Sequence, residues 1–556
     1  MFLSTATLLL QIGVVGSAVS EPPPDPRVLR GARGAQIRFE SVRRMLLPRD
    51  RSYDGGSRTC DARIGRFCYW YDSTEDKVVP EPPRIGDARA KLLAVLDSAA
   101  AVDPKEPWVA GQRVRYFIEA GRFEDAAVAA RACRAERWWC ASLEGLALHV
   151  AQNYAAADSI FAVALRDMSD AQRCDWSDIR FLVSNALARQ LARTNCGERE
   201  RLTSRLWALA QPLWSAVDRG NDARTEHLAR LTMATILEHS ANGFGTSWGS
   251  DIRQLMIRYG WDEWFTRHDP EFGSSYGPRI TGHSREPSYA FFPDIPNATA
   301  PVQSSAWRFT ETLARSRYSP RHLKRISSLA HQLTRFPRGD STFVRFAYTT
   351  RDTGMRRDRL IAAVATYARD SIHVWRLETP TSGVMLPGES VVISLEVVDP
   401  QTHRAERARY TMDRLPCHAK WCLSDLVLFD ADGGYSGNDM DSVFAVALTD
   451  TRVQASSPLG VFWEIESPAP GPAWLALTAE PINVSAARRI ATRLHLAREQ
   501  VPVRLRWQTS LQSPRQTQSL AVRLPSGARG AYRVTLSVMP SNGPIVSSVR
   551  EIEIVQ

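Results

Sequence analysis

The sequences FEDAAVAARAC (residues 123–133) and YAAADSIFAVA (residues 154–164) decide the fold of the N-terminal half of this chain. In each segment an aromatic residue is followed along the chain by small residues at helical spacing. A partner helix precedes each one, and the two partners begin near Trp108 and Trp139. Because small side chains allow two helices to cross closely, the pattern predicts helix pairs stacked one after another.

This unit resembles the tetratricopeptide repeat, which has small residues at the helix crossing and an aromatic residue at the turn. The preceding helix, from about Gly86, ends at Asp103-Pro104, where proline cannot continue it. The distance from Phe123 to Tyr154 is slightly shorter than the period of about 34 residues in that family, which indicates irregular repeats. A plain helical bundle is the alternative. We expect a tetratricopeptide-like α-helical repeat domain over residues 85–240.

The second half changes its hydrophobic period to two. From Thr342 onward, short β-branched and alternating segments are separated by turn signals such as Asp399-Pro400 and Asp432-Gly433-Gly434. This pattern predicts an antiparallel β-sandwich region of the immunoglobulin-like kind over residues 342–556, with room for two small sheet domains. Residues 241–341 are expected to be a loop-rich, aromatic connecting region with a short helix near residues 321–335. Residues 21–84 are expected to be mostly linker.

The first 20 residues are apolar and carry no charged side chain. They end in small residues, with Ala18 and Ser20 at the −3 and −1 positions, and are followed by the polar run Glu21-Pro22-Pro23-Pro24. This is the pattern of a secretory signal peptide, although the usual basic residue before the apolar core is absent. Retention of the leader as an anchor is the alternative. No later run reaches the roughly 20 apolar residues of a membrane span.

Cysteine usage agrees with export. The eight cysteines form four couples that are close in sequence: Cys60/Cys68, Cys133/Cys140, Cys174/Cys196 and Cys417/Cys422. Local couples in an oxidising compartment are typical of disulfides that close short loops. Zinc is the rival interpretation, but no couple has Cys-x-x-Cys spacing. We therefore expect disulfides, and a location in the periplasm or outside the cell.

The formal net charge of +10 invites a nucleic-acid interpretation. Of the 70 basic residues only five are lysine, and the arginines are interleaved with acids along the chain. A nucleic-acid binder concentrates its positive charge on one face or in one tract. The composition thus favours an arginine-rich solvated surface and predicts no nucleic-acid partner.

Two segments gather residues that could form a site. The first is an aromatic, loop-rich stretch whose candidate binding residues are Tyr259, Trp261, Trp264, His283 and Arg285. It could hold a ligand pocket or form the seam between the helical and sheet domains. As a hydrolase-like site it would need His283 to converge with at least two of Arg279, Arg285, Glu286 and His268.

The second segment is the loop from Asp430 to Asp441. Its carboxylates are hard oxygen ligands that would suit calcium, and the candidate ligands are Asp430, Asp432, Asp439 and Asp441. The loop departs from the EF-hand pattern because Tyr435 stands where that pattern needs glycine. A solvated hairpin loop is the alternative.

Several phrases together resemble exported bacterial proteins related to the GWxTD-domain group, over roughly residues 205–556. The phrases include Arg219-Gly-Asn-Asp-Ala-Arg-Thr-Glu-His, Trp248-Gly-Ser-Asp-Ile-Arg, Arg258-Tyr-Gly-Trp, Ile280-Thr-Gly-His, Arg338-Gly-Asp-Ser and Leu459-Gly-Val-Phe-Trp-Glu-Ile. The naming motif is absent, because Trp261-Asp-Glu-Trp follows Arg258-Tyr-Gly. The resemblance implies a helical segment followed by a β-sandwich and implies no assigned activity.

No Walker loop or dinucleotide fingerprint occurs in the sequence. We therefore expect an exported, non-catalytic scaffold of the bacterial cell envelope that binds a protein partner through its helical repeats and needs no cofactor. The alternative is an envelope enzyme of hydrolase-like type with its site in the loops of residues 244–290. A calcium-dependent adhesion module is a third interpretation.

Overall fold

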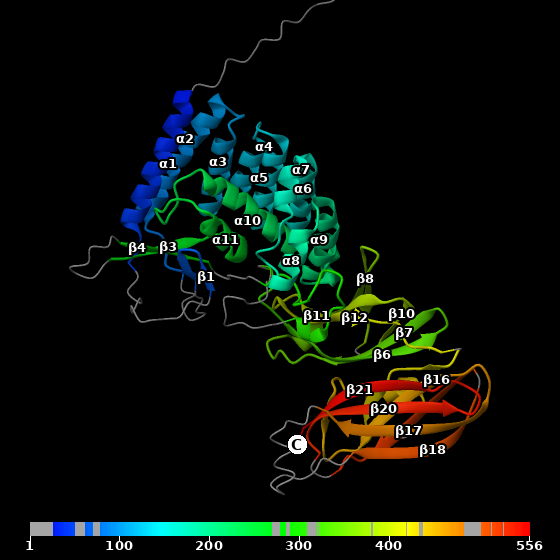
Figure 1. The fold of residues 1–556 in the computed structure, drawn as a ribbon. Helices are drawn as coiled ribbons and strands as arrows, with labels where there is room; N and C mark the ends of the chain where they lie inside the picture. Colours follow the sequence, from blue (N-terminus) through cyan, green and yellow to red (C-terminus); the bar gives the residue numbers. More distant parts are fainter. Residues whose placement is uncertain are drawn as a thin grey trace, which may run out of the picture.

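The computed structural model describes residues 26–49, 62–69, 78–269, 278–284, 290–307, 320, 322–379, 382–418, 420–432, 437–482, 502–512, 514–525 and 528–555. An N-terminal helical region is followed by a β-rich C-terminal region with mainly antiparallel sheets, as the sequence predicted (Figure 1). None of the described helices is both long and apolar enough to cross a membrane.

The helical region is built from α1 to α11. The helices are α1 (Pro26–Leu46), α2 (Pro83–Val102), α3 (Pro107–Glu119), α4 (Phe123–Arg131), α5 (Arg137–Val150), α6 (Tyr154–Asp167), α7 (Asp170–Trp176), α8 (Asn185–Arg193), α9 (Cys196–Ala210), α10 (Asp222–Glu238) and α11 (Ser250–Tyr259). The first nine follow one another across the region, while α10 and α11 return along its side (Figure 1).

Local sequence explains where these helices begin and end. Asn153 caps α6 by accepting a hydrogen bond from the backbone N–H of Ala156, and Ser169 forms a capping box with Gln172 at the start of α7. Helices α5 and α6 cross closely at Gly145, where an added Cβ would lie only 2.8 Å from the Phe161 ring. The sequence prediction of a small residue at this crossing is consistent with that geometry.

Helix α10 covers one face of α3 and α5. The Trp108 indole donates to the His239 carbonyl (2.9 Å), and Gln112 Nε2 donates to the Ile236 carbonyl (3.0 Å). Gly111 allows this approach, because a Cβ there would lie 3.2 Å from the Ile236 side chain. Most residues of α10 are buried as a result. The inner face of the helical array is therefore filled by the chain itself.

Two small hairpins lie beside the helices. Strands β1 (Ala62–Ile64) and β2 (Phe67–Tyr69) form one hairpin, and β3 (Trp264–His268) and β4 (Arg279–His283) form the other. The expectation that residues 21–84 are mostly linker is wrong for α1, while the first hairpin lies where the Cys60/Cys68 couple predicted a short loop. Helix α1 was missed because three of its five buried residues are polar, which hides the usual apolar period.

The first β-module consists of two facing sheets. One has the order β5 (Arg325–Ser328), β12 (Arg404–Met412), β11 (Val391–Asp399), β8 (Ile361–Ala368) and β9 (Ser371–Leu377). The other has the order β10 (Gly383–Pro387), β7 (Ser341–Thr349) and β6 (Ala330–Arg338). The pairings are antiparallel except for β5 with β12. A buried core that includes Val344, Phe346, Val364, Ile393 and Leu395 lies in this module.

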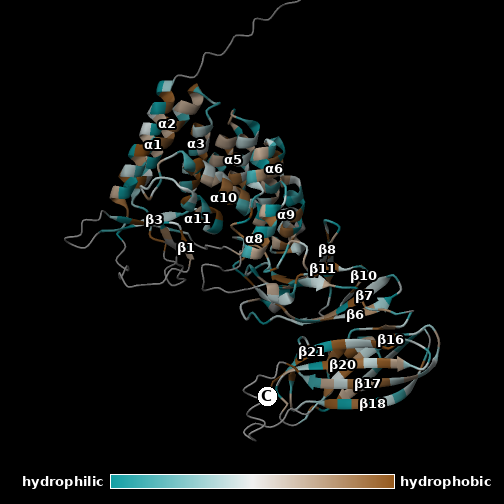
Figure 2. Cartoon of the chain, in the orientation of Figure 1, coloured by the Kyte–Doolittle hydropathy of each residue, from teal (hydrophilic) through white to brown (hydrophobic). Residues whose placement is uncertain are grey.

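The second β-module is separate in sequence and has its own core. Strand β16 (Leu459–Glu466) pairs with β13 (Cys422–Leu423), β14 (Val427–Asp430) and β19 (Arg515–Val522). The other sheet has the order β15 (Arg452–Gln454), β21 (Val546–Val555), β20 (Gly530–Pro540), β17 (Gly471–Pro481) and β18 (Val503–Leu511). Hydrophobic and hydrophilic residues alternate along β17 and β20 (Figure 2). A short helix, α12 (Met440–Ala445), precedes β15.

The sheet region begins earlier than the sequence indicated. Residues near 321–335 were expected to form a short helix, but they lie in β5 and β6 instead. Burial alternates along Ala330–Arg338, with Phe336 fully buried, and this period of two fits a strand. The boundary of the β-region is therefore near Arg325, and Thr342 lies inside the first module.

The largest core joins the helical region to the first β-module. It is made mainly of helical residues, but Ala365, Tyr367 and Val392 from β8 and β11 belong to the same cluster. The five-stranded sheet thus buries one face against the helices and contributes its other side chains to the core shared with β7.

Candidate functional site

The predicted binding residues Trp264 and His283 meet in the hairpin of β3 and β4. They are register partners, and their rings stack with centroids 5.5 Å apart and an interplanar angle of 8°. His283 Nε2 lies 2.7 Å from the Thr266 hydroxyl. Tyr259 is buried against Ala62 and Ile64 of the first hairpin, and Trp261 packs on the helical core. Arg285 lies outside the described residues.

The hydrolase-like arrangement does not form among the described residues of this hairpin. His268 pairs with Arg279 at one end, whereas His283 pairs with Trp264 at the other end, four residues along the strand. At about 3.4 Å per residue this separation is too long for the three side chains to act on one atom. Glu286 lies outside the described residues.

The hairpin supports α1. The Arg267 backbone N–H donates to the Pro48 carbonyl (2.9 Å), and Phe265 packs over Gly243, where a Cβ would come within 2.8 Å of its ring. The Arg43 guanidinium lies 5.5 Å from the centre of that ring. The described part of this hairpin therefore packs on the helical region and not on the sheet.

The candidate calcium ligands have partners within the protein. Asp439 caps α12 through the Ser442 N–H (2.9 Å), and Asp441 pairs with Arg345 (2.6 Å). Asp430 accepts from the Asp432 N–H at 2.9 Å. Within the described part of the chain, no three His, Cys, Asp or Glu side chains gather as a metal site. Residues 433–436 of this loop lie outside that part, so the calcium hypothesis stays a prediction.

Three of the predicted disulfides are present. They are Cys133–Cys140, Cys174–Cys196 and Cys417–Cys422, with Cα–Cα distances of 5.6, 5.5 and 4.6 Å. The first joins the end of α4 to α5, and the second joins α7 to the start of α9. Cys60 and the side chain of Cys68 lie outside the described residues. The three bridges thus tie together segments that are close in sequence.

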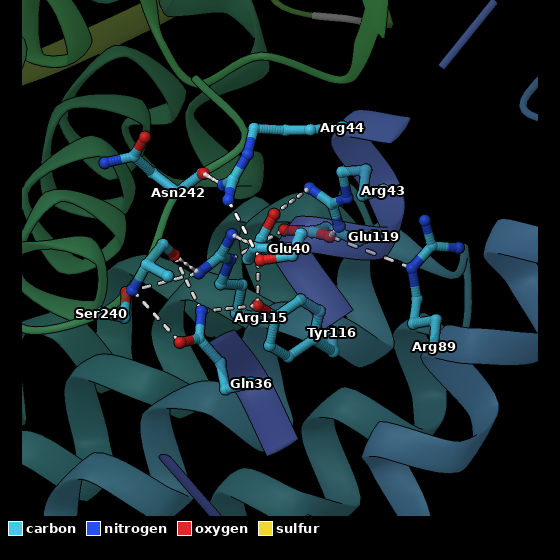
Figure 3. A network of polar contacts seen from close by, with 12 residues as sticks. Gln36, Glu40, Arg43, Arg44, Arg89, Arg115, Tyr116, Glu119, Ser240 and Asn242 are labelled. Carbon is cyan, nitrogen blue, oxygen red and sulfur yellow. Dashed lines mark hydrogen bonds and ion pairs between the residues drawn. The ribbon is translucent and has the colours of Figure 1, made fainter. Parts of the chain in front are cut away.

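A buried polar network lies under α1 and was not foreseen (Figure 3). Glu40 of α1 is fully buried, and its Oε1 accepts from Arg115 Nη2 and from the Tyr116 hydroxyl, both at 2.7 Å. Arg43 of α1 pairs with Glu119 of α3. Gln36 donates from its Nε2 to the Ala241 carbonyl (2.8 Å), which extends the network to the loop after α10.

The charges in this network balance one another. Burial alone would raise the pKa of Glu119, but Arg43 and Arg115 lower it to about 2. Burial raises the pKa of Tyr116, which therefore stays protonated and donates to Glu40. Every charge is compensated by a neighbour, so the network fixes the position of α1 and offers no free base for catalysis.

A second buried network forms the seam between the helical region and the first β-module. Glu396 and Arg409, on β11 and β12, are both fully buried and pair at 2.9 Å. Glu396 also accepts from the backbone N–H groups of Trp214 (3.0 Å) and Ser215 (2.8 Å). Arg409 Nη1 donates to the Leu209 and Gln211 carbonyls, each at 2.7 Å.

Aromatic rings pack against the arginines of this seam. The Arg409 guanidinium lies 3.9 Å from the centre of the Trp214 ring, and the Arg407 guanidinium lies 4.4 Å from that of Trp307. The Trp307 indole donates to the Arg409 carbonyl at 2.7 Å. Cation–π contacts are strongest where water is excluded. The seam is therefore specific, and the two regions form one unit.

A histidine–carboxylate pair lies between α5 and α10. His149 Nε2 lies 2.6 Å from Glu226 Oε2, and Arg230 Nε donates to Glu226 Oε1 at the same distance. Burial would raise the pKa of Glu226, but Arg230 and His149 hold it well below its usual range. Nearby, burial raises the pKa of Asp222 to about 7. Burial lowers the pKa of His227 to about 3, so this histidine is neutral and belongs to the core.

A surface hollow of about 240 Å³ lies on the side of α3 between α2 and α4. Its floor includes Ala110 and Cys133, and its rim carries Asp97, Asp103 and Glu106, together with one cation, Arg113. Arg113 pairs with Asp97 at 2.8 Å. The Cys133–Cys140 bridge fixes the edge of this hollow. Sequence reasoning placed the bridge correctly but could not see the hollow, because its lining comes from three helices.

No family model and no curated protein matches the chain. One solved structure with a partial match is the crystal structure of red sea bream transglutaminase, with 10% sequence identity and a TM-score of 0.15. The match covers 57% of this chain and 44% of that chain, so this chain spans less than half of its length. A TM-score this low carries no argument about shared fold or activity.

Proposed function

We propose that this chain is an exported, non-catalytic scaffold of the bacterial cell envelope that binds a protein partner through its helical region. Two features support export. The first 20 residues have the apolar core and small-residue end of a signal peptide. Three disulfides join cysteines that are close in sequence, which is typical of proteins in oxidising compartments.

We also propose that α3–α4 and α5–α6 are tetratricopeptide-like pairs and that the two β-modules are immunoglobulin-like sandwiches. The close crossing at Gly145 supports the first assignment, because an added Cβ would collide with Phe161. Facing sheets around separate cores support the second. The relation to the GWxTD-domain group remains a proposal on the sequence phrases alone.

The observation that carries the binding proposal is the hollow between α2, α3 and α4. Repeat proteins often bind partners on their inner face, but here α10 covers that side of α3 and α5. The hollow lies on another face of α3 and is held by the Cys133–Cys140 bridge. A partner segment that combines a small apolar side chain with a basic one fits its alanine floor and carboxylate rim.

The rigid seam adds to this proposal. Buried contacts of Glu396 and Arg409 fix the helical region on the first β-module, so the surface of both is presented in one orientation. Pre-organised surfaces lose less entropy on binding than mobile ones. The hydrolase-like alternative would need Arg285 and Glu286, which lie outside the described residues, because the described part of the β3–β4 hairpin separates His283 from His268 and Arg279.

The experiment is affinity capture from the envelope fraction with two matched variants. Ala101→Trp places a large side chain in the hollow at an exposed position, and Ala192→Trp makes the same change at an exposed position on α8. A protein captured by the unaltered chain and by Ala192→Trp, but not by Ala101→Trp, supports the proposal. Equal capture by all three chains contradicts it.

A further inference from the structure

Helix α1 carries an unusual share of the positive charge of the molecule. Its 21 residues include six arginines and one glutamate, which supplies half of the formal net charge of +10. Two of these arginines, Arg43 and Arg44, turn toward the protein, where Arg43 is buried and Arg44 donates to the Asn242 carbonyl. The remaining four, Arg27, Arg30, Arg33 and Arg38, are exposed.

Three of the exposed arginines share one side of the helix. At 100° per residue, Arg27, Arg30 and Arg38 fall within about 80° of one another. Arg33 lies nearer the buried side, and its guanidinium is 5.4 Å from the centre of the Trp108 ring of α3. The buried residues Gln36, Phe39 and Arg43 occupy the opposite side. Within the described residues, no carboxylate lies within ion-pair distance of Arg30, Arg33 or Arg38.

Two large apolar side chains accompany these arginines. Ile37 is 55% exposed and Met45 is 64% exposed, and both lie on the same outward side as the arginines. A helix that presents arginines and apolar side chains together on its outer face is typical of a membrane-surface helix. We name the face made by Arg27, Arg30, Ile37, Arg38 and Met45 the basic face of α1.

We propose that the basic face of α1 binds an anionic phospholipid bilayer surface. Charge complementarity supports this occupant, because clustered arginines attract anionic phosphate headgroups and the two apolar side chains can enter the headgroup boundary. The apolar sequence Met1–Ser20 precedes α1 by a short polar extension. A leader that is retained as an anchor would hold α1 next to the bilayer.

This mode of attachment is independent of the protein-binding hollow. The basic face belongs to the outer side of α1, while the hollow is lined by α2, α3 and α4. The network of Glu40, Arg43, Arg115 and Glu119 holds α1 in place, so the orientation of the basic face is fixed by the fold. Failure of one proposal leaves the other open to its own test.

The test is flotation of the full chain with two kinds of vesicle. One kind is phosphatidylcholine alone, and in the other about a third of the lipid is phosphatidylglycerol. The variant Arg30→Gln, Arg38→Gln removes two exposed charges while keeping good helix formers. The control Arg131→Gln, Arg166→Gln removes two exposed charges from α4 and α6. Circular dichroism melting of all three chains checks that they fold alike.

We expect the unaltered chain and the control to prefer the phosphatidylglycerol vesicles. The basic-face variant is expected to lose about 25-fold in partitioning to them, since each of its two arginines near an anionic surface contributes roughly a 5-fold gain. The preference is also expected to weaken in high salt. Equal partitioning of the variant and the control overturns the proposal. So does retention of the chain by duplex DNA without any preference for phosphatidylglycerol, which would indicate a nucleic-acid surface.

Discussion

Replacing Glu396 with glutamine tests the seam between the helical region and the first β-module. The Glu396 carboxylate accepts from Arg409, from the Ser394 hydroxyl (2.7 Å), and from the backbone N–H groups of Trp214 and Ser215. Glutamine keeps the shape but loses the charge and turns an NH₂ group toward these donors. Because Arg409 is fully buried, the substitution leaves its charge uncompensated.

The expected loss is about 4 kcal/mol in the free energy of unfolding, which is the usual cost of breaking a buried ion pair. For a unit of this size it corresponds to a fall of about 10 °C in the melting temperature. Calorimetry of the full chain measures it, and hydrogen exchange over residues 209–215 locates it. Glu389→Gln is the control, because Glu389 pairs with the exposed Arg369. This substitution should lower the free energy of unfolding by less than about 1 kcal/mol. If Glu396→Gln is no more destabilising than this control, the reasoning about the seam is wrong.

Three further changes probe the helical region. Gly145→Ala should lower the free energy of unfolding by about 1–3 kcal/mol, because the added methyl group overpacks against Phe161. An unchanged free energy of unfolding in denaturant melts would refute the close crossing. Replacing Cys174 and Cys196 with serine should lower the free energy of unfolding by about 3 kcal/mol, because their bridge closes a loop with a sequence separation of 22. Equal melting temperatures of the oxidised and reduced unaltered chain would argue against this value. Asp222→Asn should stabilise the chain at pH 8 and have little effect at pH 4. The reason is that burial raises the pKa of Asp222 to about 7, so its ionisation costs stability as the pH rises from about 4 through 7; an effect independent of pH would show that Asp222 is not the titrating group.

The sequence predicted the coarse architecture because the two periods are strong. Alanine-rich repeats around Phe123 and Tyr154 lie in helices, and the segments with a period of two after Thr342 lie in strands. Three cysteine couples were also predictable, since short loops leave few other partners. These features depend on residues that are neighbours in the chain.

Features that depend on distant residues were not predictable. Helix α1 buries Gln36, Glu40 and Arg43, so its inward side has no apolar signature, and its partners lie on α3. In the strand with Arg407 and Arg409, nothing local shows that the arginines reach the carbonyls of residues 209–212. Alternating arginines in a strand that is otherwise buried are the one signal that could have drawn attention to the seam.

For the stretch at residues 259–283, the sequence left a ligand pocket and a domain seam open. Clustered aromatic residues can line a ligand site or pack a small hairpin, and a sequence does not distinguish the two. In the structure, Tyr259 packs against Ile64, and Trp264 stacks on His283. The aromatic residues mainly fasten short β-hairpins to the helices.

Photo-crosslinking from the hollow is the most direct test of the scaffold proposal. A photoreactive amino acid would replace Ala101 at the hollow in one chain and Ala192 on α8 in another, and each chain would be irradiated in its own envelope. The proposal predicts one discrete crosslinked protein from position 101 and none of that product from position 192. The absence of a product at position 101, or the same products at both positions, would contradict it.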